Sequence, residues 1–139
     1  MPSFLEPLLK EPHVRFGLRI LRTGGLLATE VESAVDSETR RKGLLGRTGL
    51  ADGVAMVIAP TNAIHTFFMR FPIDVVFVRR DGGVLKVRRA MPAWRMAFAV
   101  RGFAVVELAG GAADRAGLRV GDRLVVERAT PVQSGSLPT

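Results

Sequence analysis

The sequence IHTFFMRFPIDVVFVR, residues 64–79, joins two apolar runs at Pro72 and decides the fold. Proline lacks the N–H of a sheet ladder and biases the preceding Phe71 toward extended geometry, so the stretch predicts two strands or one bent strand. Residues 73–78 are apolar on both faces except at Asp74, which is typical of a buried strand. We therefore expect a hydrophobic centre here, in which Asp74 needs a partner or access to solvent.

Outward from this stretch, short apolar runs bounded by turn residues predict further strands. We expect strands at residues 14–22, 26–34, 54–59, 84–88, 103–108 and 124–127, with hairpin turns at 23–25 and 80–83. A helix is predicted to begin at Ser37 and to end near Leu45, and a second to cover residues 112–116 before Gly117. Residues 91–101 are predicted to form a loop.

These elements predict a mostly β (α+β) fold, a compact barrel-like antiparallel sheet with one or two short helices. We expect an N-terminal extension at 1–13, a single β-rich domain at 14–128 and a flexible C-terminal tail at 129–139. Pro2, Pro7 and Pro12 argue against a helix in the extension. A second subunit could cover the strand edge at residues 14–21, so the oligomeric state stays open.

The composition is that of a globular protein, with 47% hydrophobic and 24% charged residues among 139. Cysteine is absent, which excludes disulfides, thiolate nucleophiles and sulfur-ligated metals. The N-terminus shows no basic start followed by an apolar run, and no stretch of about 18 apolar residues occurs anywhere. We therefore expect a cytoplasmic protein without a signal peptide or membrane span.

The formal net charge of +7 suggests an anionic partner, and arginine supplies nearly all of the positive charge. Proteins that bind single-stranded nucleic acid combine such charge with exposed aromatic rings. Most phenylalanines of this sequence lie in patterns typical of a core, so few exposed rings are expected. The sequence therefore argues against a nucleic-acid partner.

Several motifs together resemble the bacterial and archaeal family called domain of unknown function 192 (DUF192, or UPF0127). The matching pieces are GLLGR at 43–47, VAMVI at 54–58, FFMRFPIDVVF at 67–77, VELAGG at 106–111 and GD at 121–122. They occur in the family's order and cover about residues 30 to 127. The resemblance implies a compact, mostly β fold and no established activity. It also makes Arg47, Asp74 and Glu107, which match polar motif positions, the candidates for a shared site or a structural polar cluster.

Each candidate allows more than one chemistry. Arg47 is expected to form an ion pair with Asp74, because such a pair would satisfy a buried carboxylate. Asp74 and Glu107 could instead form a carboxylate pair for acid–base hydrolysis. A metal site would need His65 together with these carboxylates, and we expect neither a metal nor a cofactor. No serine elbow or spacing of histidine and aspartate supports nucleophilic catalysis.

Three functions stay open. The first is a binding or accessory protein for a small polar or anionic ligand, with Arg47, Asp74 and Glu107 at the rim of a pocket lined by Met56, Phe68 and Met69. The second is a small hydrolase-like enzyme that uses Asp74 or Glu107. The third, nucleic-acid binding through the basic surface, is disfavoured by the aromatic pattern.

Overall fold

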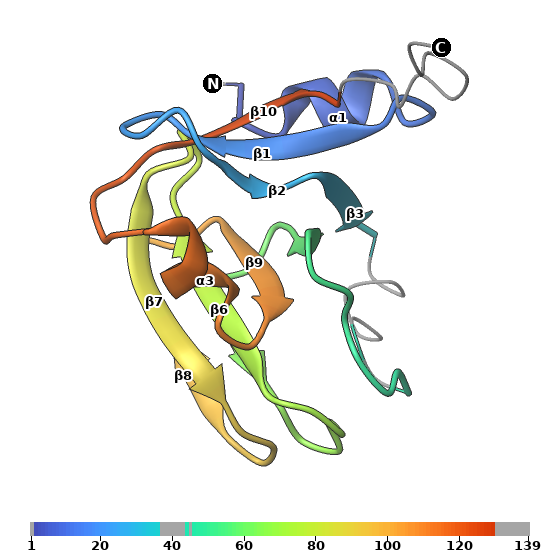
Figure 1. Ribbon diagram of the computed structural model, residues 1–139, viewed down its shortest axis with the longest axis vertical. Coiled ribbons are helices and arrows are strands. Elements are labelled where there is room, and N and C mark those ends of the chain that lie inside the picture. The colour runs from blue at the N-terminus through green and yellow to red at the C-terminus, as the bar shows by residue number, and fades with distance from the viewer. Residues whose placement is uncertain (1, 37–43, 45, 130–139) are drawn as a thin grey trace, which may run out of the picture.

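The computed structural model describes residues 2–36, 44 and 46–129, in which strands predominate (Figure 1). The two helices in these residues are α1 (Glu6–Lys10) and α3 (Ala112–Ala116). The strands are β1 (Phe16–Ile20), β2 (Leu26–Ala28), β3 (Glu30–Ala34), β4 (Val54–Ile58), β5 (Ala63–His65), β6 (Ile73–Val78), β7 (Val84–Met91), β8 (Met96–Phe98), β9 (Ala104–Ala109) and β10 (Leu124–Arg128). The predicted mostly β fold with short helices is confirmed.

The strands form three sheets. Their orders are β10-β1-β2, β3-β4-β9-β6-β7 and β5-β8. Within the five-stranded sheet, β3 and β4 run parallel and every other neighbouring pair is antiparallel. The three-stranded sheet lies at one end of the molecule together with α1, and β8 lies at the opposite end (Figure 1).

Strand β6 is fully buried, as its apolar sequence predicts. All its residues are buried, and β9 and β7 pair with its two edges. Val76 and Val78 contribute to one hydrophobic cluster, whereas Val75 and Phe77 contribute to a second cluster on the other face. The five-stranded sheet thus separates two apolar cores, and each face of β9 and β6 points into a different one.

Residues 26–34 do not form the single strand that their pattern predicts. The carbonyl of Gly53 accepts the N–H groups of Thr29 (2.8 Å) and Glu30 (3.1 Å), and the chain changes sheets at that point. Strand β2 pairs with β1, and β3 pairs with β4. Strand β1 also pairs with β10 on its other side, so the predicted free edge at residues 14–21 is wrong.

Residues 66–72 form a turn instead of the extended run expected before Pro72. The Thr66 side chain is buried and donates its hydroxyl to the Pro92 carbonyl at 2.6 Å, while the Thr66 carbonyl accepts the Met69 N–H at 3.1 Å. Phe68 adopts a left-handed φ of 65° in this turn. The loop predicted at 91–101 likewise contains β8, because this segment pairs with β5.

The N-terminal residues form helix α1, so the expectation that proline prevents a helix there is wrong. Pro7 lies in the first turn, where the missing N–H has no intrahelical partner to lose. Leu5 is buried in the cluster that contains Val76. None of the helices in the described ranges is long and apolar enough to cross a membrane.

Helix α3 is confirmed at the predicted residues and ends at Gly117, whose φ of 70° is the left-handed conformation that glycine adopts easily. The helix predicted from Ser37 and the tail beyond residue 129 lie outside the described residues.

Candidate functional site

One row of directly paired residues crosses the five-stranded sheet and contains two glutamates. Glu32 on β3 pairs with Met56 on β4, Met56 with Glu107 on β9, and Glu107 with Val75 on β6. Paired residues on neighbouring strands project to the same face of a sheet. Glu107 therefore projects between Met56 and Val75 into the hydrophobic cluster that contains both.

The Glu107 side chain is only 3% exposed, although it carries a carboxyl group. No residue in the described part of the chain donates a hydrogen bond to that carboxyl or forms an ion pair with it. Burial raises the pKa of Glu107 to about 8, since a charged carboxylate loses its hydration in an apolar environment. At neutral pH the group is therefore mainly the neutral acid, which can donate one O–H.

Arg47 lies beside this row. Its Nη2 atom is 2.8 Å from the Oε2 atom of Glu32, and both side chains are 40% exposed. This Oε2 atom is buried without a well-aligned hydrogen bond, so the contact is an ion pair. The positive charge of Arg47 also acts on Glu107 and partly opposes the rise in the pKa of Glu107. Arg47 thus forms an ion pair with Glu32 and acts on Glu107 only through its charge.

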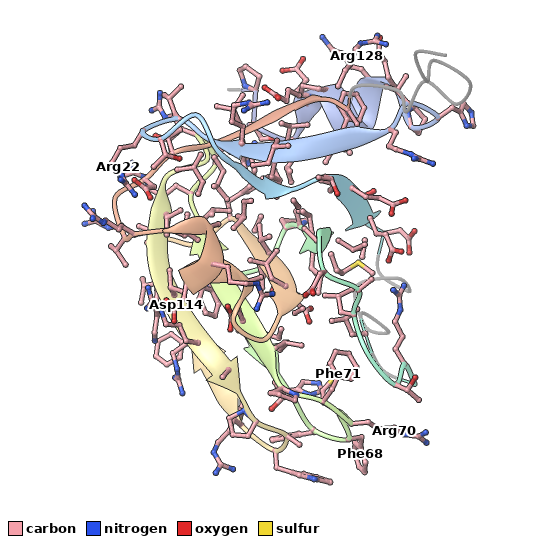
Figure 2. All side chains as sticks on the ribbon, in the orientation of Figure 1. Arg22, Phe68, Arg70, Phe71, Asp114 and Arg128 are labelled. Atoms are coloured by element: carbon pink, nitrogen blue, oxygen red, sulfur yellow. The ribbon has the colours of Figure 1, made fainter. Side chains whose placement is uncertain are left out.

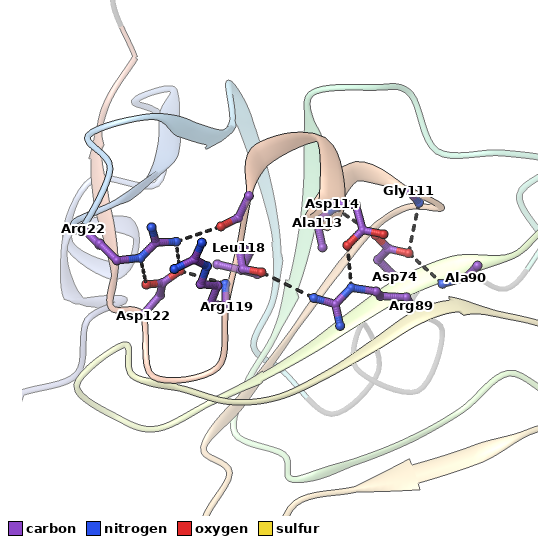
Figure 3. A network of polar contacts seen from close by, with 11 residues as sticks. Arg22, Asp74, Arg89, Ala90, Gly111, Ala113, Asp114, Leu118, Arg119 and Asp122 are labelled. Atoms are coloured by element: carbon purple, nitrogen blue, oxygen red, sulfur yellow. Dashed lines mark hydrogen bonds and ion pairs between the residues drawn. The ribbon is translucent and has the colours of Figure 1, made fainter.

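Asp74 has a different environment. Its Oδ1 atom accepts the N–H groups of Ala90 (2.8 Å) and Gly111 (3.1 Å), and its Oδ2 atom accepts the N–H of Ala113 (2.9 Å) (Figure 3). Gly111 and Ala113 belong to the start of α3, whose first N–H groups have no partner within the helix. Asp74 therefore caps α3 from a neighbouring strand.

The predicted ion pair between Arg47 and Asp74 is wrong. Backbone donors satisfy the Asp74 carboxylate, and Arg47 contacts Glu32. The carboxylate pair that acid–base hydrolysis would need is not formed either. Asp74 pairs with Leu108, one position beyond Glu107, so the two carboxyl groups project to opposite faces of the sheet.

The three residues expected to line a pocket have different surroundings. Met56 and Met69 are buried in the same cluster as Val75. Phe68 is exposed, and its ring lies 4.6 Å from that of Trp94. His65 is exposed and accepts the Phe67 N–H through Nδ1 at 3.3 Å. Within residues 2–36, 44 and 46–129, no cluster of three or more His, Asp or Glu side chains could hold a metal ion.

Glu32 is the site residue that the sequence does not single out. It belongs to the site because β3 runs parallel to β4, and a parallel pairing between separate segments leaves no local signal.

A second polar cluster, around Asp122, connects the turn between β1 and β2 to the turn before β10. Asp122 accepts Arg22 Nε (2.6 Å) and the Arg119 N–H (2.8 Å), and Arg22 also bonds the Gly117 carbonyl at 2.8 Å (Figure 3).

Comparisons with known proteins agree with this fold. The family model DUF192, described as "Uncharacterized ACR", matches residues 19–126. A crystal structure from Sinorhizobium meliloti, described as a candidate transcription regulator, has a TM-score of 0.70 at 24% identity and covers 80% of this chain and 91% of that chain. A protein of unknown function from Novosphingobium aromaticivorans has a TM-score of 0.68 at 25% identity, with 79% and 82% covered. No curated protein matches the chain.

Proposed function

The chain belongs to the DUF192 family, whose description names no activity, and we propose that it binds a small polar or anionic ligand at Glu107. The ligand would meet Glu107 and Arg47 together. The same proposal gives Asp74 no part in binding, since its carboxylate already accepts hydrogen bonds from the backbone.

The observation that carries the proposal is the nearly buried acid of Glu107, to which no described residue donates a hydrogen bond. A buried polar group without a hydrogen bond costs about 1–3 kcal/mol in proteins. Its direct neighbours Met56 and Val75 are apolar, so a methionine or leucine at position 107 would avoid this cost. A polar residue at a position that suits an apolar one is expected at functional sites. The cost at Glu107 is explained if a bound ligand completes the hydrogen bonding.

The protonation state of Glu107 selects the chemistry of the ligand. With a pKa raised to about 8, the acid donates its O–H at neutral pH. Arg47 is a donor with more N–H groups than its ion pair with Glu32 requires. Two donors favour a ligand with acceptor oxygens, such as a carboxylate or phosphate. Met56 and Val75 offer apolar contact to the rest of a small carboxylate.

The alternative of a hydrolase-like enzyme has weaker support. It would depend on Glu107 alone, because Asp74 projects to the other face of the sheet and has three backbone donors. A raised pKa does suit a general acid, so hydrolysis is the second candidate function. Any compound that stabilises the protein can also be tested for hydrolysis.

The test is a thermal-shift screen of the full chain with small monocarboxylates, dicarboxylates and inorganic phosphate. We expect at least one compound to raise Tm at neutral pH and to lose this effect above the Glu107 pKa, where ionised Glu107 repels an anion. Glu107→Gln should retain the shift and remove its pH dependence, because the amide still donates. Glu107→Ala should lose it.

The matched control is Glu30→Ala, which removes an exposed glutamate from the same strand as Glu32. It should leave the ligand-induced shift unchanged. The proposal is wrong if no compound stabilises the wild-type protein, or if Glu107→Ala responds as the wild type does.

A further inference from the structure

Large apolar side chains gather on the surface at the end of the molecule formed by β5, β8 and the turns beside them. We call this surface the aromatic tip. It consists of Phe68 (70% exposed), Trp94 (56%) and Met96 (68%). Phe98 (62%) and Val100 (80%) continue the exposed apolar surface along β8 and the turn after it, beside Lys86. Figure 2 shows Phe68 and Arg70 at this end, remote from Arg128 and α1. The sequence argument that exposed rings are scarce is therefore wrong for this part of the protein.

The fold holds these side chains outward. Along β8, Met96 and Phe98 are exposed while Ala97 between them is buried, so the larger side chains take the outer face and the small one faces the core. A strand at a water-covered surface normally shows the reverse arrangement. The outward face of β8 is thus built for contact with something other than water.

The backbone of Phe68 and Trp94 also has the geometry of a functional surface. Phe68 and Trp94 have left-handed φ values of 65° and 66°, a conformation that costs bulky residues energy and concentrates at functional sites. Their rings lie 4.6 Å apart. The two turns are joined at Thr66, whose N–H donates to the Arg95 carbonyl (2.8 Å) and whose carbonyl accepts the Trp94 N–H (3.0 Å).

The charge around the aromatic tip has one sign. The segments that form this end, residues 60–72 and 91–101, contain Arg70, Arg95 and Arg101 and no aspartate or glutamate. Arg70 follows Phe68 and Met69 directly and is exposed. None of these three arginines forms an ion pair with a carboxylate of the described residues. The tip therefore combines exposed apolar groups with a surplus of cations.

We propose that the aromatic tip docks the protein onto the surface of an anionic membrane. Tryptophan and phenylalanine partition into the interface between headgroups and acyl chains, while neighbouring arginine and lysine bind anionic headgroups. Stacking of single-stranded nucleic acid would use the rings, but Met96 offers no flat face to a base. A second copy of the chain would bring the same cations against each other, which like charges oppose.

Trp94 makes the proposal directly measurable, because it is the only tryptophan of the chain. Vesicles of phosphatidylcholine mixed with phosphatidylglycerol should shift its fluorescence emission to the blue, and high salt should reverse the shift. Vesicles of phosphatidylcholine alone should change it much less. Oligothymidylate should leave the emission unchanged.

Two double variants test the apolar and the charged side chains of the surface separately. Phe68→Ser with Met96→Ser removes apolar contact, and Arg70→Gln with Arg95→Gln removes charge. Each should weaken partition into anionic vesicles about tenfold or more, as measured by flotation. Leu21→Ser with Val120→Ser, which changes two exposed apolar residues near the three-stranded sheet, should bind like the wild type. Circular dichroism and Tm verify that every variant is folded.

Three results would overturn the proposal. One is an unchanged Trp94 emission with anionic vesicles, and another is equal weakening by the Leu21 and Val120 control. The third is quenching of Trp94 by oligothymidylate without any vesicle binding, which would identify a nucleic-acid surface instead. None of these results depends on the ligand proposed at Glu107.

Discussion

Asp74 and Glu107 lie on adjacent paired strands and point to opposite faces of one sheet. Asp74 pairs with Leu108, and Glu107 pairs with Val75, so the two carboxyl groups belong to neighbouring rows. Asp74 accepts three backbone N–H groups, whereas the Glu107 carboxyl has no hydrogen bond from a described residue. One acid therefore stabilises the fold, and the other is the acid that we propose binds a ligand.

The first prediction concerns the role of Asp74. Asp74→Ala should lower the free energy of unfolding by about 3–5 kcal/mol, because three donors lose a charged acceptor and buried N–H groups are left unpaired. Urea denaturation measures the change. Asp114→Ala removes a mostly exposed carboxylate from α3, the helix that Asp74 caps, and should cost less than about 1 kcal/mol. A loss at Asp74 no larger than at Asp114 would contradict a capping role.

The second prediction follows from the raised pKa of Glu107. An acid whose folded pKa lies above its unfolded value binds more protons in the folded state, so its stabilising contribution falls as pH rises. The contribution is fully present below the ordinary pKa of 4.5 and is lost as pH rises through about 8. Relative to Glu107→Gln, the wild-type free energy of unfolding should decrease by about 1 kcal/mol per pH unit in this window. Parallel pH profiles of the two proteins would contradict the prediction.

The third prediction concerns Arg47, whose charge opposes the rise in the pKa of Glu107. Arg47→Gln should extend the pH-dependent loss of stability to higher pH, since the ionised form of Glu107 loses a nearby cation. The stability at neutral pH should change by less than about 1 kcal/mol, because the pair with Glu32 is partly exposed. Arg47→Lys keeps the charge and should behave more like the wild type in the same urea series. If Arg47→Gln and the wild type lose stability over the same pH range, the charge of Arg47 does not act on Glu107.

The fourth prediction concerns the buried carboxylate of Asp122. Asp122→Ala should destabilise the protein by about 2–3 kcal/mol, because Arg22 and the Arg119 N–H lose their shared acceptor. The Arg22 guanidinium lowers the pKa of Asp122, so its contribution is present above the ordinary value of 3.8 and is lost as pH falls through the lower folded value. Asp52→Ala, at an exposed carboxylate paired with Arg115, is the matched control and should have little effect.

Elements with a strong local signal are predictable from the sequence. The apolar run of β6, the Asp81-Gly82 turn before β7 and the glycine that ends α3 each depend on neighbouring residues, and all three are found where the pattern predicts them. The division of residues 26–34 is different, because it depends on the carbonyl of Gly53 far along the chain. No local pattern could reveal it.

The site was only partly predictable for the same reason. Glu107 is a candidate from its motif, and its burial on the face of Met56 follows from pairing that only the fold supplies. The partner of Asp74 could have been anticipated from the small residues that begin α3, since free N–H groups at a helix start attract a carboxylate. Glu32 joins Arg47 only through the parallel pairing of β3 and β4.

The central claim is that Glu107 is held as a buried, protonated acid. A pH titration of the Glu107 carboxyl carbon by NMR, assigned by comparison with Glu107→Gln, tests it most directly. The account predicts a midpoint near the raised pKa of about 8. A midpoint near the ordinary value of 4.5 would contradict it, because Glu107 would then be a solvated carboxylate with no unsatisfied donor to offer.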